Sequence, residues 1–229
     1  MQLPRLFVGF DAEEALAHAV FAHSVQARSS LPVSITPVMR RQLSAVHSRP
    51  RDELASTDFA ITRFLVPWLC NYEGWAIFAD GDMLCRADIC ELWSLRDERF
   101  SIQVVQHAQK EGVSHKFLGR PQTSYPRKNW SSLMIFNNAR CRALTPQYVN
   151  RAPGLDLHRF LWLDEAEEIG PLPRQWNHLV GVDAPDAAAK IAHFTLGMPF
   201  FHGYNECEFA KDWRAERDAA GAYTGKGDE

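Results

Sequence analysis

Two aspartates separated by a single glycine, Asp80 and Asp82, are the residues of this chain best suited to chemistry. They follow the apolar run 75–79, which contains aromatic and β-branched residues and predicts a buried strand. Acids at the carboxyl end of such a strand lie where open α/β sheets bind ligands. Because glycine lets the backbone turn tightly, both carboxylates can converge on one hard cation. The pattern indicates a metal that holds a nucleoside diphosphate, although Asp-Gly is also a common turn dipeptide.

A third ligand for such a metal is His193, which lies in the run 191–197 and is followed by Gly197. An imidazole beside two carboxylates suits Mn²⁺ better than Mg²⁺, because nitrogen is a softer ligand than oxygen. The alternative for His193 is a core histidine that is hydrogen-bonded to a backbone carbonyl.

Two further positions could contact a nucleotide. Gly9, Phe10 and Asp11 end the first predicted strand, at the usual mouth of a nucleotide crevice. Asp11 could accept hydrogen bonds from a base or a ribose hydroxyl, and it could equally cap the following helix. Arg63 could pair with phosphate or with Asp80, or it could be a solvated helix charge.

Aromatic, amide and hydroxyl side chains gather where a sugar could be bound. The segment 125–132 contains five of them, and a second aromatic–amide pair follows at 176–177. Sugars are held by hydrogen bonds to amides and hydroxyls and by stacking on aromatic rings, so we predict an acceptor or sugar site formed by Asn129, Trp130, Ser131, Ser132, Trp176 and Asn177. Asp164 and Glu165 form a second pair of acids after an apolar run. Each of these features alone is more often surface or structure.

The elements that must position these residues begin with a β-α-β unit, which predicts a parallel sheet. The first helix has Asp11 at its N-cap with Glu14 as a capping-box partner. Segment 156–163 fits either helix or strand, and 40–57 and 107–130 are predicted loops. The predicted strands are 6–10, 33–38, 75–79, 101–106, 132–137 and a late strand or turn at 188–195. The predicted helices are 12–27, 58–72 with Pro67 kinking or ending it, 88–95 and 206–220.

Length and composition fit one α/β domain. The chain has 229 residues, of which 46% are hydrophobic and 23% charged, as expected for a globular protein with a full core. We expect a catalytic domain at 1–205, followed by a C-terminal helix and flexible tail at 206–229. The formal net charge of −3 gives no sign of a nucleic-acid partner.

The chain shows no sign of export or of membrane insertion. Its N-terminus lacks the pattern of a signal peptide, and no window approaches the roughly 18 apolar residues of a membrane span. The five cysteines are an odd number without any Cys-x-x-Cys spacing, which argues against a zinc ribbon or a disulfide framework. We therefore expect reduced thiols and a cytoplasmic location. The sequence does not indicate an oligomeric state.

The motifs, taken in order, resemble those of glycosyltransferase family 8. The resemblance covers about residues 5–205 and rests on segments 7–11, 62–64, 78–82, 130–137, 162–165, 173–177 and 193–197. It implies a GT-A fold, which is a Rossmann-like, mixed but mainly parallel sheet flanked by helices. It also implies a nucleotide-sugar donor, usually a UDP-sugar, together with Mn²⁺ (or Mg²⁺), and transfer to an acceptor hydroxyl with retention at the anomeric carbon.

The resemblance also assigns roles to residues. It implies Asp80, Asp82 and His193 as metal ligands and Asp164 as the group beneath the reacting anomeric carbon. The donor would be contacted by Gly9, Phe10, Asp11, Arg63 and Gly197. One departure concerns a lysine that contacts the diphosphate in the family, because this chain has Met198 and Pro199 where the family has its Lys-Pro-Trp-like ending. Arg127 or Lys128 could take over that contact.

Two other functions compete with sugar transfer. A nucleotidyltransferase shares paired aspartates and the same architecture, but it would normally have a Gly-rich, basic loop near the N-terminus, and residues 9–11 do not form one. The second alternative is a nucleotide-sugar-binding protein that has lost turnover. The missing lysine makes that alternative plausible.

Overall fold

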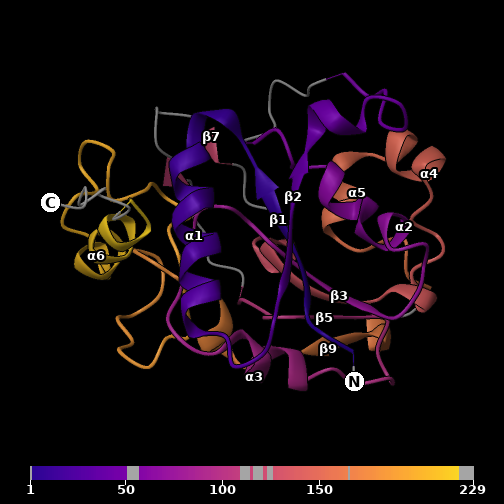
Figure 1. Cartoon of the computed structure of the whole chain (residues 1–229). Helices are drawn as coiled ribbons and strands as arrows, with labels where there is room; N and C mark the ends of the chain where they lie inside the picture. The colour runs from indigo at the N-terminus through magenta and orange to yellow at the C-terminus, as the bar shows by residue number, and fades with distance from the viewer. Residues whose placement is uncertain are drawn as a thin grey trace, which may run out of the picture.

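The computed structural model describes residues 2–50, 57–108, 114–115, 121–122, 126–164 and 166–221. A six-stranded sheet forms its centre (Figure 1). In spatial order the strands are β2 (Ser34–Met39), β1 (Arg5–Phe10), β3 (Trp75–Ala79), β8 (Leu133–Asn137), β5 (Ile102–Val104) and β9 (Ile169–Pro171). Strand β8 runs antiparallel to β3 and β5, and the other neighbours are parallel. This confirms the predicted mixed, mainly parallel sheet.

Helices cover both faces of the sheet because its strands are apolar on both sides. Leu6 and Val8 of β1 pack with α1 (Ala15–Arg28) and α3 (Ile89–Ser94) on one face. Phe7, between them in the sequence, points into the opposite core. That second core is closed by α2 (Val66–Leu69), α4 (Pro146–Arg151) and α5 (Gly154–His158), which lie together in Figure 1.

A second, three-stranded sheet packs against α1. It consists of β10 (His178–Leu179), β11 (Ile191–His193) and β4 (Met83–Cys85) in that order. Helix α6 (Ala210–Gly221) packs against α1, and its Trp213 is buried with Leu84 and Phe194. A short antiparallel pair, β6 (Ser114–His115) and β7 (Pro121–Gln122), completes the described strands.

Several predicted elements differ in extent from those observed. The helix predicted at 12–27 begins as a 3-10 turn, Ala12–Glu14, before α1. The helix predicted at 58–72 is reduced to a 3-10 turn, Thr62–Leu65, and the single turn of α2. Pro67 lies in the first turn of α2, where its missing N–H costs nothing, and so it starts this helix rather than ending it. Within the described residues, the remaining 3-10 turns are Arg40–Leu43, Trp130–Ser132, Asn138–Arg140, Ala166–Glu168 and Arg174–Asn177.

Segment 156–163, for which the sequence allowed either helix or strand, is helical only in its first residues: α5 ends at His158. Most of the predicted loop at 107–130 lies outside the described residues. All five cysteines have free thiols. Among the described helices, none has the length and apolar character needed to cross a membrane.

Candidate metal site

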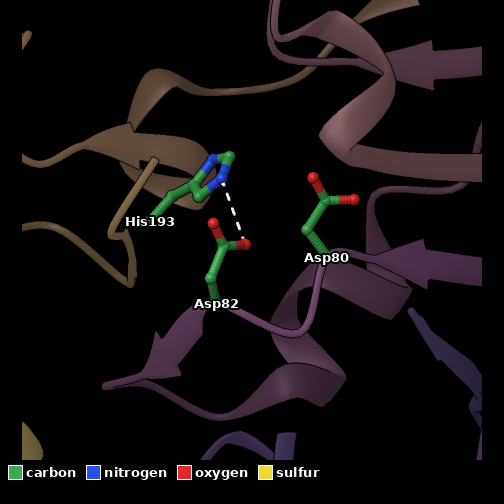
Figure 2. Close-up of side chains that lie close together, drawn as sticks. All are labelled: Asp80, Asp82 and His193. Carbon is green, nitrogen blue, oxygen red and sulfur yellow. Dashed lines mark ion pairs between the residues drawn. The ribbon is translucent and has the colours of Figure 1, made fainter. Parts of the chain in front are cut away.

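Asp80, Asp82 and His193 converge on one point. A ligand atom of each lies within 4.8 Å of those of the other two. Figure 2 shows both carboxylates, from the loop between β3 and β4, facing the imidazole of β11. The Asp82 Oδ1 atom is 3.4 Å from His193 Nε2. The two aspartate side chains are each 13% exposed and the histidine 3%, so a cation held here would contact protein on one side and solvent on the other.

Strand pairing brings the three residues together although 111 positions separate Asp82 from His193. Asp80 follows the end of β3, and its backbone N–H donates to the Ser132 carbonyl at 2.9 Å. Strand β4 begins directly after Asp82 and pairs antiparallel with β11, so that Met83 lies opposite His193. The Phe194 N–H then donates to the Asp82 carbonyl at 2.9 Å. The small second sheet therefore positions the histidine.

Glycine is required at position 81 by lack of space. A Cβ on Gly81 would lie 2.5 Å from the backbone oxygen of Gly9, at the end of β1. Gly81 does not adopt a left-handed backbone conformation, which corrects the expectation of a tight turn dependent on glycine. Gly9 is equally confined, because a Cβ there would lie 2.4 Å from the Phe59 ring. Gly81 thus allows the turn after β3 to approach the end of β1, and Gly9 makes room for the Phe59 ring.

A chain of hydrogen bonds fixes the orientation of His193. The Ser132 hydroxyl donates to the Asn129 carbonyl at 2.6 Å, so it must accept the bond from Asn177 Nδ2 at 2.8 Å. The amide oxygen of Asn177 then lies 3.0 Å from His193 Nδ1. Because this oxygen only accepts, Nδ1 carries a proton, and Nε2, 3.4 Å from Asp82 Oδ1, is the ring nitrogen that would bind a cation. His193 has an amide partner rather than the backbone carbonyl of the alternative interpretation.

We expect Asn177→Leu to weaken Mn²⁺ binding by about 10- to 100-fold, the usual effect of losing a group that orients a metal-binding histidine. Isothermal titration of the purified protein with Mn²⁺ measures this change. Asn138→Leu is the matched control, because Asn138 is another buried amide but donates to the Glu73 carbonyl instead. Equal loss of affinity in the two variants would contradict the orienting role.

Arg63 is buried beside Asp80 and is not a solvated helix charge. Its Nη1 atom lies 2.8 Å from both Asp80 Oδ1 and the Ser131 carbonyl. The guanidinium is also flanked by the rings of Phe59 and Phe78, at 5.2 and 5.1 Å. Of the two pairings considered from the sequence, the structure contains the one with Asp80. Arg63 therefore holds the Asp80 carboxylate in place, and a contact to the donor stays a prediction.

His158 contacts the same residue as Arg63, because its Nδ1 is 2.7 Å from the Ser131 hydroxyl. Burial, together with the nearby Arg63, lowers the pKa of His158 to about 3. The unfolded chain takes up a proton near the ordinary pKa of 6.5, whereas the folded chain stays neutral there. His158 therefore contributes stability that is fully present above pH 6.5 and is lost as the pH falls toward 3.

We expect His158→Asn to reduce the dependence of stability on pH. Asparagine can keep the hydrogen bond to Ser131 but does not titrate. The slope of unfolding free energy against pH between pH 6 and 4 should decrease by about 1 kcal/mol per pH unit. Urea unfolding at several pH values measures it. His202→Gln, which replaces an exposed histidine, should leave the slope unchanged, and an unchanged slope in His158→Asn would refute the assignment.

Of the residues predicted to contact the nucleotide, Gly9, Phe10 and Asp11 lie at the carboxyl end of β1. Asp11 is buried, and its two carboxylate oxygens accept from the backbone N–H groups of Glu13 and Asp58, each at 3.0 Å. The capping role of Asp11 is thus realised, with Glu13 N–H as the partner. Phe10 packs edge-on against His18. Gly197 lies further away in the chain, under the Tyr204 ring, where a Cβ would be 2.7 Å from the ring carbons. Nucleotide binding by these residues stays a prediction.

The residues predicted to bind the acceptor separate into two groups. Trp130 is partly buried, and its indole N–H donates to the His107 carbonyl at 2.9 Å. Trp176 is 2% exposed and packs in the core beneath Lys190, so it offers no ring face to an acceptor. Asn177 and Ser132 are buried and take part in the hydrogen-bond chain to His193. Their placement therefore supports an orienting role, and Trp130 keeps the predicted role at the acceptor.

Asp164 is exposed and lies between α5 and β9, while its neighbour Glu165 falls outside the described residues. Arg127 and Lys128 are the two bases considered in place of the family's lysine. Arg127 donates to the Arg159 carbonyl at 2.5 Å, and its guanidinium lies 5.6 Å from the Trp130 ring centroid. Lys128 is partly buried. The catalytic role of Asp164 and a diphosphate contact by either base stay predictions.

Comparison with solved structures defines the class of fold. The bifunctional glycosyltransferase WbbM has a TM-score of 0.65 to this chain at 15% identity, over 94% of this chain and 49% of WbbM. This chain therefore spans about half of WbbM. The galactosyltransferase LgtC, solved with donor and acceptor sugar analogues, has a TM-score of 0.58 at 9% identity, over 94% of this chain and 95% of LgtC. The fold is that of the GT-A glycosyltransferases.

A closer relationship exists in sequence. Protein CDI of Arabidopsis thaliana is 43% identical over 223 residues, which cover 93% of this chain and 86% of that protein. The chain belongs to the family of Protein CDI. No family model matches it. Membership of glycosyltransferase family 8 stays a prediction.

Proposed function

We propose that this protein transfers a sugar from a nucleotide sugar to an acceptor hydroxyl, with a divalent cation held by Asp80, Asp82 and His193. The observation that carries the proposal is the convergence of these three residues at the carboxyl edge of a GT-A sheet. Open α/β sheets bind their ligands at this edge. The likeness to a galactosyltransferase solved with donor and acceptor sugar analogues supports the same class of substrates.

The donor set suits the cation. Two carboxylates and an imidazole whose Nε2 faces Asp82 are ligands that favour Mn²⁺ over Mg²⁺. When bound, such a cation offsets the negative charge that grows on a departing diphosphate. We propose UDP as the nucleotide, on the resemblance to glycosyltransferase family 8.

The chain's own residues would divide the remaining work. Arg63 keeps the Asp80 carboxylate oriented, and Asn177 keeps the His193 proton on Nδ1. Departure of the diphosphate leaves positive charge at the anomeric carbon, which Asp164 would stabilise as a carboxylate. The acceptor hydroxyl would attack on the face that the diphosphate leaves and pass its proton to the departing diphosphate oxygen, giving the proposed retention of configuration. Residues 206–229 would then lie outside the catalytic domain, 1–205.

Nucleotide release from a panel of donors tests this function. Purified protein is incubated with UDP-glucose, UDP-galactose, UDP-N-acetylglucosamine and GDP-mannose, with Mn²⁺ and with EDTA. We expect UDP release from at least one UDP-sugar with Mn²⁺ and none with EDTA. Release of pyrophosphate from a sugar phosphate and UTP would indicate the nucleotidyltransferase instead. Tight Mn²⁺-dependent binding of a donor without any release would indicate a binding protein.

A further inference from the structure

A buried histidine beside the metal site has no assigned role. His107 is 8% exposed, and neither of its ring nitrogens has a hydrogen-bond partner among the described residues. Buried polar side chains in native proteins nearly always have such partners, because leaving them unpaired opposes folding. An imidazole with two unused nitrogens therefore indicates a polar ligand that is bound during function.

The backbone holds His107 at the edge of the sheet where the metal site lies. The residue follows β5, and its N–H donates to the Val105 carbonyl at 3.1 Å while its carbonyl accepts from the Trp130 indole at 2.9 Å. Strand β8 begins beside this point, and Ser132 just before it accepts the bond from Asp80. His107 thus lies among the residues that connect β3, β5 and β8 at the carboxyl edge of β3.

Its electrostatic surroundings indicate which ligand it suits. Burial lowers the pKa of His107 to about 4, with Asp183 opposing the change and His193, Arg174 and His178 adding to it. The ring is therefore neutral near pH 7 and offers one donor and one acceptor. A neutral ring has no charge to offer a phosphate. A sugar hydroxyl, which both donates and accepts, matches it.

A second metal site is a poorer explanation of these unused nitrogens. Across the described residues, the only group of three or more acidic, histidine or cysteine ligands close enough for a cation is Asp80, Asp82 and His193. His107 is not part of it. The geometric link to the metal site is the pairing of β5 with β8, since Ser132, just before β8, accepts from the Asp80 N–H.

We propose that His107 binds a hydroxyl group of the transferred sugar and thereby helps to select the donor. This inference rests on the proposed sugar transfer and adds a residue that recognises the sugar rather than the nucleotide. A site built to hydrogen-bond a hydroxyl discriminates strongly against ligands that lack it, because its own buried groups are then left unpaired.

The test compares binding of UDP with binding of UDP-sugars, in Mn²⁺, by isothermal titration. UDP-glucose, UDP-galactose and UDP-N-acetylglucosamine are tested, and the one that wild type binds most tightly is used for the comparison. His107→Leu should bind UDP as tightly as wild type does. It should bind that UDP-sugar about tenfold or more weakly. His107→Gln, which keeps a donor and an acceptor, should lose less. His47→Leu is the matched control, since His47 is also buried and its Nδ1 lacks a hydrogen-bond partner in the described structure, and it should bind both ligands as wild type does.

Thermal unfolding without ligand supplies a second readout. His107→Leu should unfold at the temperature of wild type or above it, because the leucine breaks no hydrogen bond of the ring. A large drop in unfolding temperature would show that the ring is structural and would overturn the proposal. Equal loss of UDP and UDP-sugar affinity would overturn it as well, as would unchanged affinity for both. Absence of Mn²⁺-dependent UDP binding in wild type would instead refute the proposed function itself.

Discussion

Asp82→Asn and Asp80→Asn are expected to reduce Mn²⁺-dependent release of UDP from the donor by on the order of 10³-fold, because each removes a charged ligand from the cation that stabilises the leaving group. The fold should persist, since asparagine keeps one oxygen acceptor in nearly the same place. Asp80→Asn should lose more stability than Asp82→Asn, because it leaves the buried Arg63 guanidinium without its carboxylate. Donor turnover and thermal unfolding measure the two effects.

Asp97→Asn is the matched control for these variants. Asp97 pairs with Arg99 on the surface, away from the metal site, and its replacement should leave turnover unchanged. Normal Mn²⁺-stimulated turnover in an Asp80→Asn, Asp82→Asn double variant would contradict the assignment of both ligands.

The second large effect is expected at Asp164. A carboxylate that stabilises the transition state but contacts neither metal nor nucleotide should change kcat with little change in donor affinity. We expect Asp164→Ala to lose on the order of 10²-fold in kcat, the effect of removing one electrostatic stabiliser. Single-turnover kinetics together with donor titration separate the two quantities.

Glu165→Ala is the natural comparison, because the two acids are adjacent in the sequence. Glu165 begins the acidic run 165–168, which predicts a solvated edge, and its replacement should leave kcat within a few-fold of wild type. If Glu165→Ala loses kcat and Asp164→Ala does not, Glu165 is the reacting acid.

Local sequence signals correctly predicted the strands that carry the site. The apolar run ending in Asp80 is β3, and the β-α-β opening gives the parallel pair β1 and β2. Both predictions depend on hydrophobic periodicity and on turn and cap residues that are contiguous in the chain. His193 could be selected from sequence for the same reason, since it ends an apolar run followed by glycine.

The contacts that complete the site could not be predicted in this way. Strand β4 has only three residues and is specified by its pairing with β11, which lies more than a hundred positions away. The same holds for Asn177, whose pattern with Trp176 resembles a sugar site but whose side chain faces His193. His107 had a usable signal, because it directly follows the strand predicted at 101–106, yet only the structure shows that its ring is buried without partners.

Electron spin-echo spectroscopy of bound Mn²⁺ tests the central claim most directly, because it detects nuclei of the groups that coordinate the ion. With Mn²⁺ and UDP added to wild type, we expect coupling to a directly bound histidine nitrogen and to phosphorus. His193→Gln should abolish the nitrogen coupling, whereas His202→Gln should retain it. Bound Mn²⁺ without a histidine nitrogen, or a nitrogen coupling that persists in His193→Gln, would contradict a metal held by Asp80, Asp82 and His193.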